Sequence, residues 1–367
     1  MTSYKQRAWW IRSGIALVGL CLALGLEWGR PAVLRGLDEG IRDLVIRTMA
    51  SSQPDHRVAV VDIDEQSLAE LGPWPWSRAR IADLIESLLL DQHVKVVGLD
   101  IVFPQPADPV GDARVAALVA HTPVTVAQIL DYTGRTYQLN QGLLTGGVIY
   151  NNASGAATAQ GYIANHEGIA KARCVGNIGY LPDRDGTLRH IPTQTVYEGR
   201  LYQSLSQAML ACANNRPLRA EVPANENGLW RIPYRTTQDA YTVVTAADLI
   251  LQRIPANTLS GRYVLIGSSG LSLGDHVITP LAPLTAGVMV HAAAISGLLD
   301  LQQGLDNTPT SGRDLLLVWC LATFSLTVWL IPRLSAWMGT SLVLVECAAW
   351  LALACFGAFD RLEWSIT

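Results

Sequence analysis

The chain has 367 residues, enough for about two domains, and 50% of them are hydrophobic. Its mean hydropathy of +0.23 is high for a soluble chain, so the apolar residues must be concentrated in particular segments. The formal net charge of -4 excludes the strongly basic footprint that nucleic-acid binding requires, and we expect no nucleic-acid partner.

The first segment, residues 1–30, carries Lys5, Arg7 and Arg12 ahead of an apolar run at 15–26. This pattern is typical of a signal anchor or a signal peptide. Because further apolar segments occur near the end of the chain, we favour an uncleaved transmembrane anchor. The basic N-terminus would stay in the cytoplasm, and the residues after 30 would be exported. Residues 31–49 then show the apolar spacing of an amphipathic helix.

Residues 58–90 form the most informative stretch, with a strand, a carboxylate-rich turn and a helix. The β-branched run at 58–63 predicts the strand, and Asp62 and Asp64 would project from one face if the strand continued through them. Apolar residues at helical spacing from 81 to 89 follow Ser77, a suitable N-cap. A second apolar strand at 94–103 contains Asp100. These elements predict a parallel, right-handed strand-helix-strand unit.

Further strands are predicted at 123–130, 230–234 and 262–268, and further helices at 113–119, 201–213, 246–253 and 287–299. Residues 131–175 are rich in small and polar residues without a period, which is typical of irregular loops. The Asp185-Gly186 pair lies between two strand-like segments and predicts a β-hairpin. The alternation of strands and helices predicts an α/β fold in the exported domain, with a mainly parallel sheet and flanking helices.

Four motifs are spread along this part of the chain: VDIDEQSLAELGPWPWSR, GLDIVFPQP, GRYVLIGSSGLSLGDHVITPL and GVMVHAAAISGLL. In this order they resemble the second type of CHASE domain, the extracytoplasmic sensory module found in front of bacterial cyclases and kinases. The resemblance covers about residues 30–300. It implies a sensor domain that regulates a cytoplasmic effector such as a nucleotide cyclase or protein kinase, usually as a homodimer. The resemblance does not identify the ligand.

Polar residues occur where the predicted strands end, and parallel α/β sheets bind ligands beyond the carboxyl ends of their strands. The candidate ligand-binding residues are Asp62, Asp64, Glu65, Asp100, Ser268, Asp275 and His291. They predict a crevice that binds an unknown extracytoplasmic ligand or ion, because clustered carboxylates attract cations. Alternatively, these acids cap helices and pair with Arg78 or Arg80.

A third interpretation is a membrane-tethered envelope hydrolase that uses Asp62, Asp64 and His291 in the same carboxylate crevice. The sequence contains no nucleophile elbow, no paired-histidine zinc motif and no Walker loop. We therefore predict no catalytic residue, no enzyme activity in this portion and no cofactor, and we leave a metal site undecided.

Cys174 and Cys212 are the two cysteines that fall in the predicted exported domain. An oxidising envelope permits a disulfide between them, which makes the pair a candidate bridge. The alternative is a free thiol at Cys212 on the buried face of its predicted helix.

Residues 315–332 and 337–359 are two long apolar segments joined by a short turn with Arg333. They predict a membrane hairpin and, with the N-terminal anchor, three transmembrane helices. The predicted domains are a cytoplasmic N-terminus with the first helix at 1–30, an extracytoplasmic sensory domain at 31–312, and the hairpin with a short external tail at 313–367. We expect the chain to lie in the inner membrane, in contact with the lipid bilayer, with its effector beyond a further span after Thr367.

Overall fold

The computed structural model describes residues 32–304, apart from 150–154, 217–221, 271–272 and 274–275, together with scattered residues between 10 and 25 and between 321 and 349. The chain divides into two compact units, Met1–Met49 with Asn307–Thr367, and Ala50–Asp306. In the first unit, helix α2 (Ala32–Met49) forms where the amphipathic spacing predicts it. The domain boundaries predicted from the sequence depend on membrane topology and stay a prediction.

The prediction of three transmembrane helices is wrong for the described part of the chain. Among those residues, no helix combines the length and the apolar character that crossing a membrane requires. The predicted segments 15–26, 315–332 and 337–359 lie for the most part outside the described residues. An apolar run indicates burial from water, and burial alone does not specify a long membrane-crossing helix.

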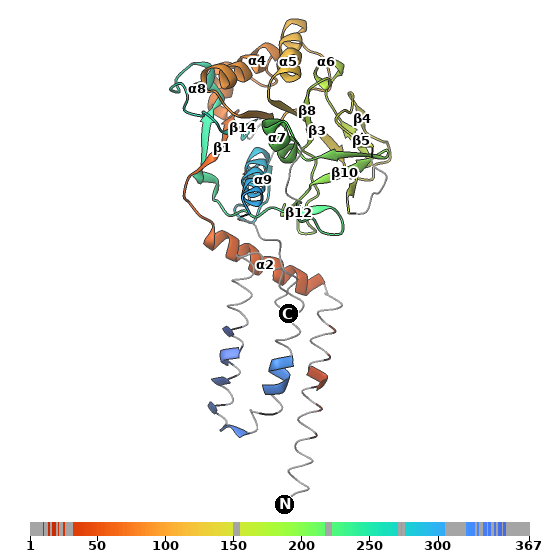
Figure 1. The fold of residues 1–367 in the computed structure, drawn as a ribbon, viewed down its shortest axis with the longest axis vertical. Helices are drawn as coiled ribbons and strands as arrows, with labels where there is room; N and C mark the ends of the chain where they lie inside the picture. Colours follow the sequence, from red (N-terminus) through yellow and green to blue (C-terminus); the bar gives the residue numbers. More distant parts are fainter. Residues whose placement is uncertain are drawn as a thin grey trace, which may run out of the picture. The chain divides into compact units, whose positions relative to one another are not determined.

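An eight-stranded sheet forms the centre of the unit Ala50–Asp306 (Figure 1). Its parallel strands, in spatial order, are β13 (Tyr241–Thr245), β1 (Asp55–Asp62), β14 (Tyr263–Gly267), β2 (Val96–Leu99), β3 (Val124–Asp131) and β8 (Cys174–Asn177). Strand β7 (Gly161–Ile163) pairs antiparallel with the end of β3, and β4 (Asn140–Gln141) pairs parallel with β7. The described unit is thus mixed α/β, with a mainly parallel central sheet.

The strand-helix-strand unit predicted at 58–103 exists, but its two strands are not neighbours. β1 and β2 run parallel, and β14 lies between them. Strand β1 ends at Asp62, and helix α3 (Glu65–Leu71) begins three residues later. Asp62 and Asp64 therefore do not share the face of one strand, as the sequence analysis had allowed. Ser77 caps α4 (Arg78–Glu86) as predicted, because its Oγ accepts a hydrogen bond from the Arg80 amide at 3.3 Å.

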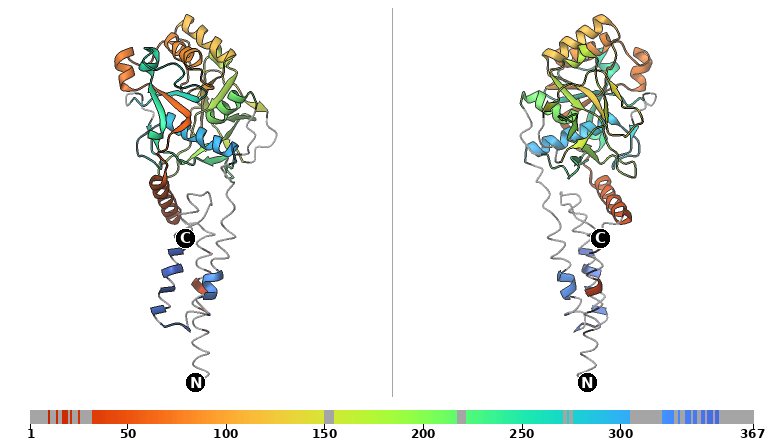
Figure 2. Two further views of the ribbon diagram at one scale, coloured as in Figure 1. Left: turned by 60° about the vertical axis from the view of Figure 1, so that its left-hand side comes forward. Right: turned by 90° about the vertical axis from the view of Figure 1, so that its right-hand side faces the viewer.

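Helices cover both faces of the sheet (Figures 1 and 2). One face packs against α4, α5 (Pro109–His121) and α8 (Ala246–Ile250) in a core that includes Ile81, Leu84 and Val115, all fully buried. The other face packs against α7 (Leu205–Asn214) and α9 (Gly287–Gln302). Successive side chains of a strand point to opposite faces of the sheet, and both faces are covered. The strands are therefore apolar at consecutive positions, which explains the continuous apolar runs in the sequence.

Two glycines let α7 and α9 approach the sheet closely. A Cβ atom on Gly176 of β8 would lie 2.4 Å from the Leu205 Cα of α7. A Cβ atom on Gly267 of β14 would lie 2.5 Å from the Val288 Cβ of α9. Such distances are shorter than van der Waals contact, so these strand positions require glycine. The close packing fixes the first turns of both helices beside the carboxyl ends of the strands.

The segment 131–175, predicted as irregular, holds several short elements. Two of them, β5 (Val148–Ile149) and β6 (Ala157–Thr158), form a smaller sheet with β11 (Arg200–Gln203) and β10 (Gln194–Tyr197) from later in the chain. Two further pairs lie wholly outside 131–175: β12 (Leu229–Arg231) with β9 (His190–Pro192), and β15 (His276–Val277) with β16 (Thr285–Ala286). The short helix α6 (Glu167–Ala170) also lies here. Of the hairpin predicted at Asp185-Gly186, the turn is present, with Gly186 at a φ of 83°, but the strand that follows, β9, pairs with β12.

Cys174 of β8 and Cys212 of α7 are joined by a disulfide. The two residues are separated by 38 positions, and the bridge ties α7 to the edge of the parallel part of the sheet. Cys212 lies on a largely buried helix, as expected from its sequence context, and it is bonded rather than free.

Candidate functional site

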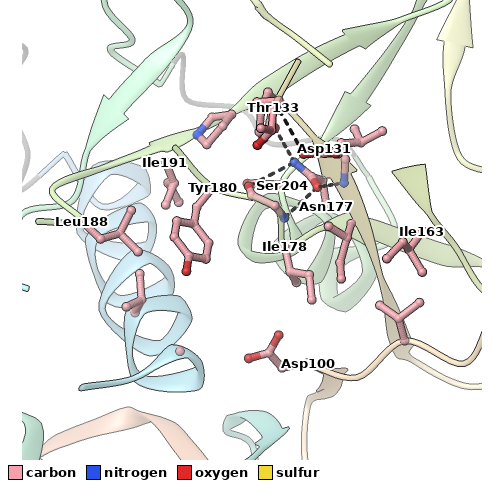
Figure 3. A pocket seen from close by; sticks show the side chains of 18 of the residues that line it. Asp100, Asp131, Thr133, Ile163, Asn177, Ile178, Tyr180, Leu188, Ile191 and Ser204 are labelled. Carbon is pink, nitrogen blue, oxygen red and sulfur yellow. Dashed lines mark hydrogen bonds between the residues drawn. The ribbon is translucent and has the colours of Figure 1, made fainter. Parts of the chain in front are cut away.

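A cavity of about 740 Å³ lies beyond the carboxyl ends of β2, β3 and β8 (Figure 3). This is the edge of a parallel sheet at which ligands bind, and the volume lies in the range of roughly 300–1,000 Å³ that is common for small-molecule sites. The first turns of α9 close one side of the cavity through Val290 and His291. Much of the wall is apolar, with side chains such as Ile129, Ile163 and Ile178.

Asp100 follows β2 directly and brings a carboxyl group to the cavity. Its side chain is only 4% exposed, and its Oδ1 lies 3.8 Å from His291 Nε2, beyond hydrogen-bond distance. No described residue forms a hydrogen bond with Asp100 Oδ2. Burial raises the pKa of this carboxyl to about 7, because the charged form is poorly solvated there. The cavity therefore contains a carboxyl group that titrates near neutral pH.

Asn177 ends β8 and organises the opposite side of the cavity (Figure 3). Its Oδ1 accepts hydrogen bonds from the amides of Leu130 and Gly179, both at 2.8 Å, and its Nδ2 donates to the Tyr132 hydroxyl at 2.8 Å. Tyr132 also shares a 2.7 Å hydrogen bond with Thr195 Oγ1. Burial raises the pKa of Tyr132 above its usual value, so the phenol stays neutral. The network connects β8 and the end of β3 into one rigid wall.

Asp131 and Arg135 form an ion pair at the rim of the cavity. Arg135 Nε donates to Asp131 Oδ2 at 2.5 Å, and the Thr133 amide donates to Asp131 Oδ1 at 3.0 Å. The Asp131 side chain is 10% exposed and that of Arg135 is 54% exposed. The carboxylate at the rim is thus neutralised by its own neighbour, in contrast to Asp100.

The other predicted site residues that the structure describes do not line the cavity. Asp62 Oδ1 accepts from the Ser269 amide at 2.7 Å and its Oδ2 from Ser269 Oγ at 2.5 Å. Ser268 Oγ donates to the Ile63 carbonyl at 2.8 Å. These contacts fasten the loop after β14 to the end of β1, which is a structural role.

The next two predicted residues belong to helix α3. Asp64 is its N-cap, because Asp64 Oδ1 accepts from the Ser67 amide at 2.8 Å, and Glu65 is its exposed first residue. Asp275 lies outside the described residues. Of the six predicted residues that the structure describes, it brings Asp100 and His291 together at the cavity.

Replacing Asp64 with alanine should lower the free energy of unfolding by about 1 kcal/mol, the usual cost of losing an N-cap side chain. Chemical denaturation of the wild-type and variant chains measures this difference. Because Asp64 does not line the cavity, small-molecule binding should be unchanged. A variant of unchanged stability that loses binding would show that Asp64 acts in ligand recognition instead.

The residues missed from the sequence are Asn177, Tyr132, Asp131 and Arg135. Asp131 and Tyr132 lie at the end of β3, a strand that the sequence predicts, Arg135 follows in the loop, and Asn177 ends the short strand β8. A carboxyl or amide group at the end of a strand is the signal that could have found Asp131 and Asn177, as it found Asp100.

The comparison with protein families decides what this α/β domain is. The family model described as the CHASE2 domain matches residues 15–337, which is most of the chain. The chain belongs to the CHASE2 family. CHASE2 domains are extracytoplasmic sensory domains, so the resemblance seen in the motifs is confirmed, and a sensory role outside the cytoplasm follows. No curated protein and no solved structure matches the chain.

Proposed function

We propose that this CHASE2 chain is the signal-input part of a sensor, and that its cavity binds a small extracytoplasmic ligand. Binding regulates a cytoplasmic effector such as a nucleotide cyclase or a protein kinase. The sensor works as a homodimer held at the inner membrane. The observation that carries the proposal is the cavity of about 740 Å³ at the carboxyl ends of β2, β3 and β8, since its size and position are those of a ligand site.

Helix α9 supports the proposal because it connects the cavity to the opposite end of the unit Ala50–Asp306. Its 16 residues correspond to a length of about 24 Å. His291, near its start, lines the cavity, and Asp300, near its end, accepts a 2.7 Å hydrogen bond from Arg57 Nη1. Arg57 also binds Asp55 at 2.8 Å, so the end of α9 is tied to the start of β1. A shift of α9 on ligand binding would thus change a second, distant set of contacts.

The geometry favours a binding role over the hydrolase alternative. That alternative needs Asp62 and Asp64 beside His291, and these two carboxylates are used in loop and helix-cap contacts outside the cavity. The proposal therefore rests on the cavity and on the family.

Replacing Ile178 with tryptophan should block ligand binding, because Ile178 points into the cavity and a larger ring would fill that space (Figure 3). The full chain is melted against a panel of small amines, alcohols and carboxylic acids. We expect at least one compound to raise the melting temperature of the wild type in a concentration-dependent manner, since ligands stabilise the state that they bind. The Ile178→Trp variant should not respond.

Replacing Val110 with tryptophan provides the matched control. Val110 is 73% exposed on α5 and does not line the cavity, so Val110→Trp should respond as the wild type does. Equal responses of the wild type and Ile178→Trp, or no response of any chain, would contradict a ligand site in this cavity.

A further inference from the structure

The charges on the cavity wall are unequally compensated. Among the described lining residues, the carboxyl groups are those of Asp100 and Asp131, and the cationic or potentially cationic groups are those of Arg135 and His291. Asp131 is neutralised by Arg135. Asp100 has one oxygen at 3.8 Å from His291 and a second oxygen without a hydrogen-bond partner in the described structure. The cavity thus presents one buried acceptor that a ligand can satisfy.

The chemistry of that acceptor selects the ligand. A buried carboxyl oxygen without a partner is unfavourable, and a donor from a ligand removes this cost. A cationic donor gains more than a neutral donor, because charge-assisted hydrogen bonds are about twice as strong. An anionic ligand would be repelled wherever this carboxyl group is ionised. Since the side chains around Asp100 include Val102, Ile129 and Ile178, the rest of the ligand should be apolar.

A metal ion fits the site less well than an organic cation. Divalent cations need several oxygen or nitrogen ligands at once. Among the described residues there is no group of three or more His, Cys, Asp or Glu side chains that could hold a metal ion. An ammonium group, in contrast, can be held by one carboxylate, with its apolar substituent in the cavity.

We propose that the cavity binds a small organic amine, with its protonated amino group on the carboxyl group of Asp100 and its apolar body against the isoleucine and valine side chains. The inference rests on the proposed function, that this cavity is the ligand site, and adds the chemical class of the ligand.

Proton release accompanies this binding. In the empty cavity, burial holds the pKa of Asp100 at about 7. The ammonium group stabilises the carboxylate, so an amine that binds below that pKa displaces the carboxyl proton to the buffer. At pH 6, about 0.9 proton should leave for each amine bound, and at pH 8 about 0.1. The other titratable groups facing Asp100 are His291 on α9, the Asp131–Arg135 pair and the phenols of Tyr132 and Tyr180.

Three probes with one apolar body test the inference: phenethylamine, phenethyl alcohol and hydrocinnamate. Isothermal titration calorimetry of the full chain at pH 6, in two buffers of different ionisation enthalpy, gives both the affinity and the number of protons released. Affinities are compared at pH 8, where the Asp100 carboxyl is already ionised, and we expect the amine to bind there roughly ten- to hundredfold more tightly than the alcohol. The carboxylate should bind most weakly. The proton release of the wild type tests the role of Asp100 without any substitution.

Two variants test whether Asp100 causes the preference for the amine over the alcohol. Asp100→Asn removes the charge with little change of shape, and it should reduce the amine-to-alcohol affinity ratio to about one and abolish proton release. Asp62→Asn removes a half-buried carboxyl from the end of β1, outside the cavity, and should leave the affinity ratio and the proton release unchanged.

The outcomes separate the inference from its premise. Equal affinities of amine and alcohol in the wild type, a preference for the carboxylate, or an amine preference that survives in Asp100→Asn would overturn the inference and leave the cavity as a ligand site. Binding of none of the three probes would count against the inference and against the proposed function together.

Discussion

Replacing Asn177 with leucine should lower the free energy of unfolding by about 3–5 kcal/mol, among the largest effects of a single polar substitution in this domain. Asn177 is 2% exposed, and its Oδ1 satisfies the amides of Leu130 and Gly179. Leucine has the same number and branching of side-chain heavy atoms but no acceptor, so the substitution leaves two backbone donors without that partner. It also removes the donor to the Tyr132 hydroxyl.

Chemical denaturation of the full chain measures this loss. Asn214→Leu is the matched control, because Asn214 is partly exposed near the end of α7 and donates a single hydrogen bond to the Leu210 carbonyl. That variant should change stability by about 0.5 kcal/mol or less. Similar losses in the two variants would show that the Asn177 network does not hold β8 and β3 together.

The second large effect is a pH dependence that Asp100 imposes on stability. Its pKa is about 7 in the folded domain against a reference of 3.8, so the folded state binds more protons than the unfolded state between these values. The stability that the raised pKa of Asp100 contributes is then fully present below about pH 4 and is lost as the pH rises toward 7. A difference of about three pKa units lowers the free energy of unfolding by an amount on the order of 4 kcal/mol over this pH range.

The comparison with Asp100→Asn isolates this contribution. Other acids act in the opposite sense: hydrogen bonding to Arg189 lowers the pKa of Asp185 to about 2, which favours the folded state as the pH rises from 2 to 4. Such contributions are common to both chains and cancel in their difference. The stability of Asp100→Asn relative to the wild type should increase from pH 4 to pH 8. A constant difference would mean that Asp100 is solvated or paired in the folded state.

Much of the fold could be predicted because its elements are encoded locally. The local sequence is enough to recognise β1 by its β-branched run, the helix behind Ser77 by its helical spacing, and β14 by its apolar run. The order of the strands is not local. β14 is inserted between β1 and β2 although about 160 residues separate it from β2, and β13 was missed entirely.

The candidate site was predicted in part for the same reason. Asp100 and His291 lie at the expected edge of the sheet, since the carboxyl ends of parallel strands meet there. Asp62 ends a strand too, but β14 separates β1 from β2, and the Asp62 carboxylate binds Ser269 instead. Asn177 escaped prediction because a strand of four residues, such as β8, is too short to show a period. Asp131 ends the predicted strand β3 and was overlooked although its strand was found.

Hydrogen–deuterium exchange of the full chain tests most directly whether the cavity of this CHASE2 domain is its ligand site. The chain is measured alone and saturated with the compound that stabilises it most. We predict slower exchange in peptides covering residues 98–103, 129–135, 177–180 and 287–292, which surround the cavity. Exchange in residues 62–71, at the end of β1 and in α3, should be unchanged. Protection confined to 62–71, with none around the cavity, would contradict the account.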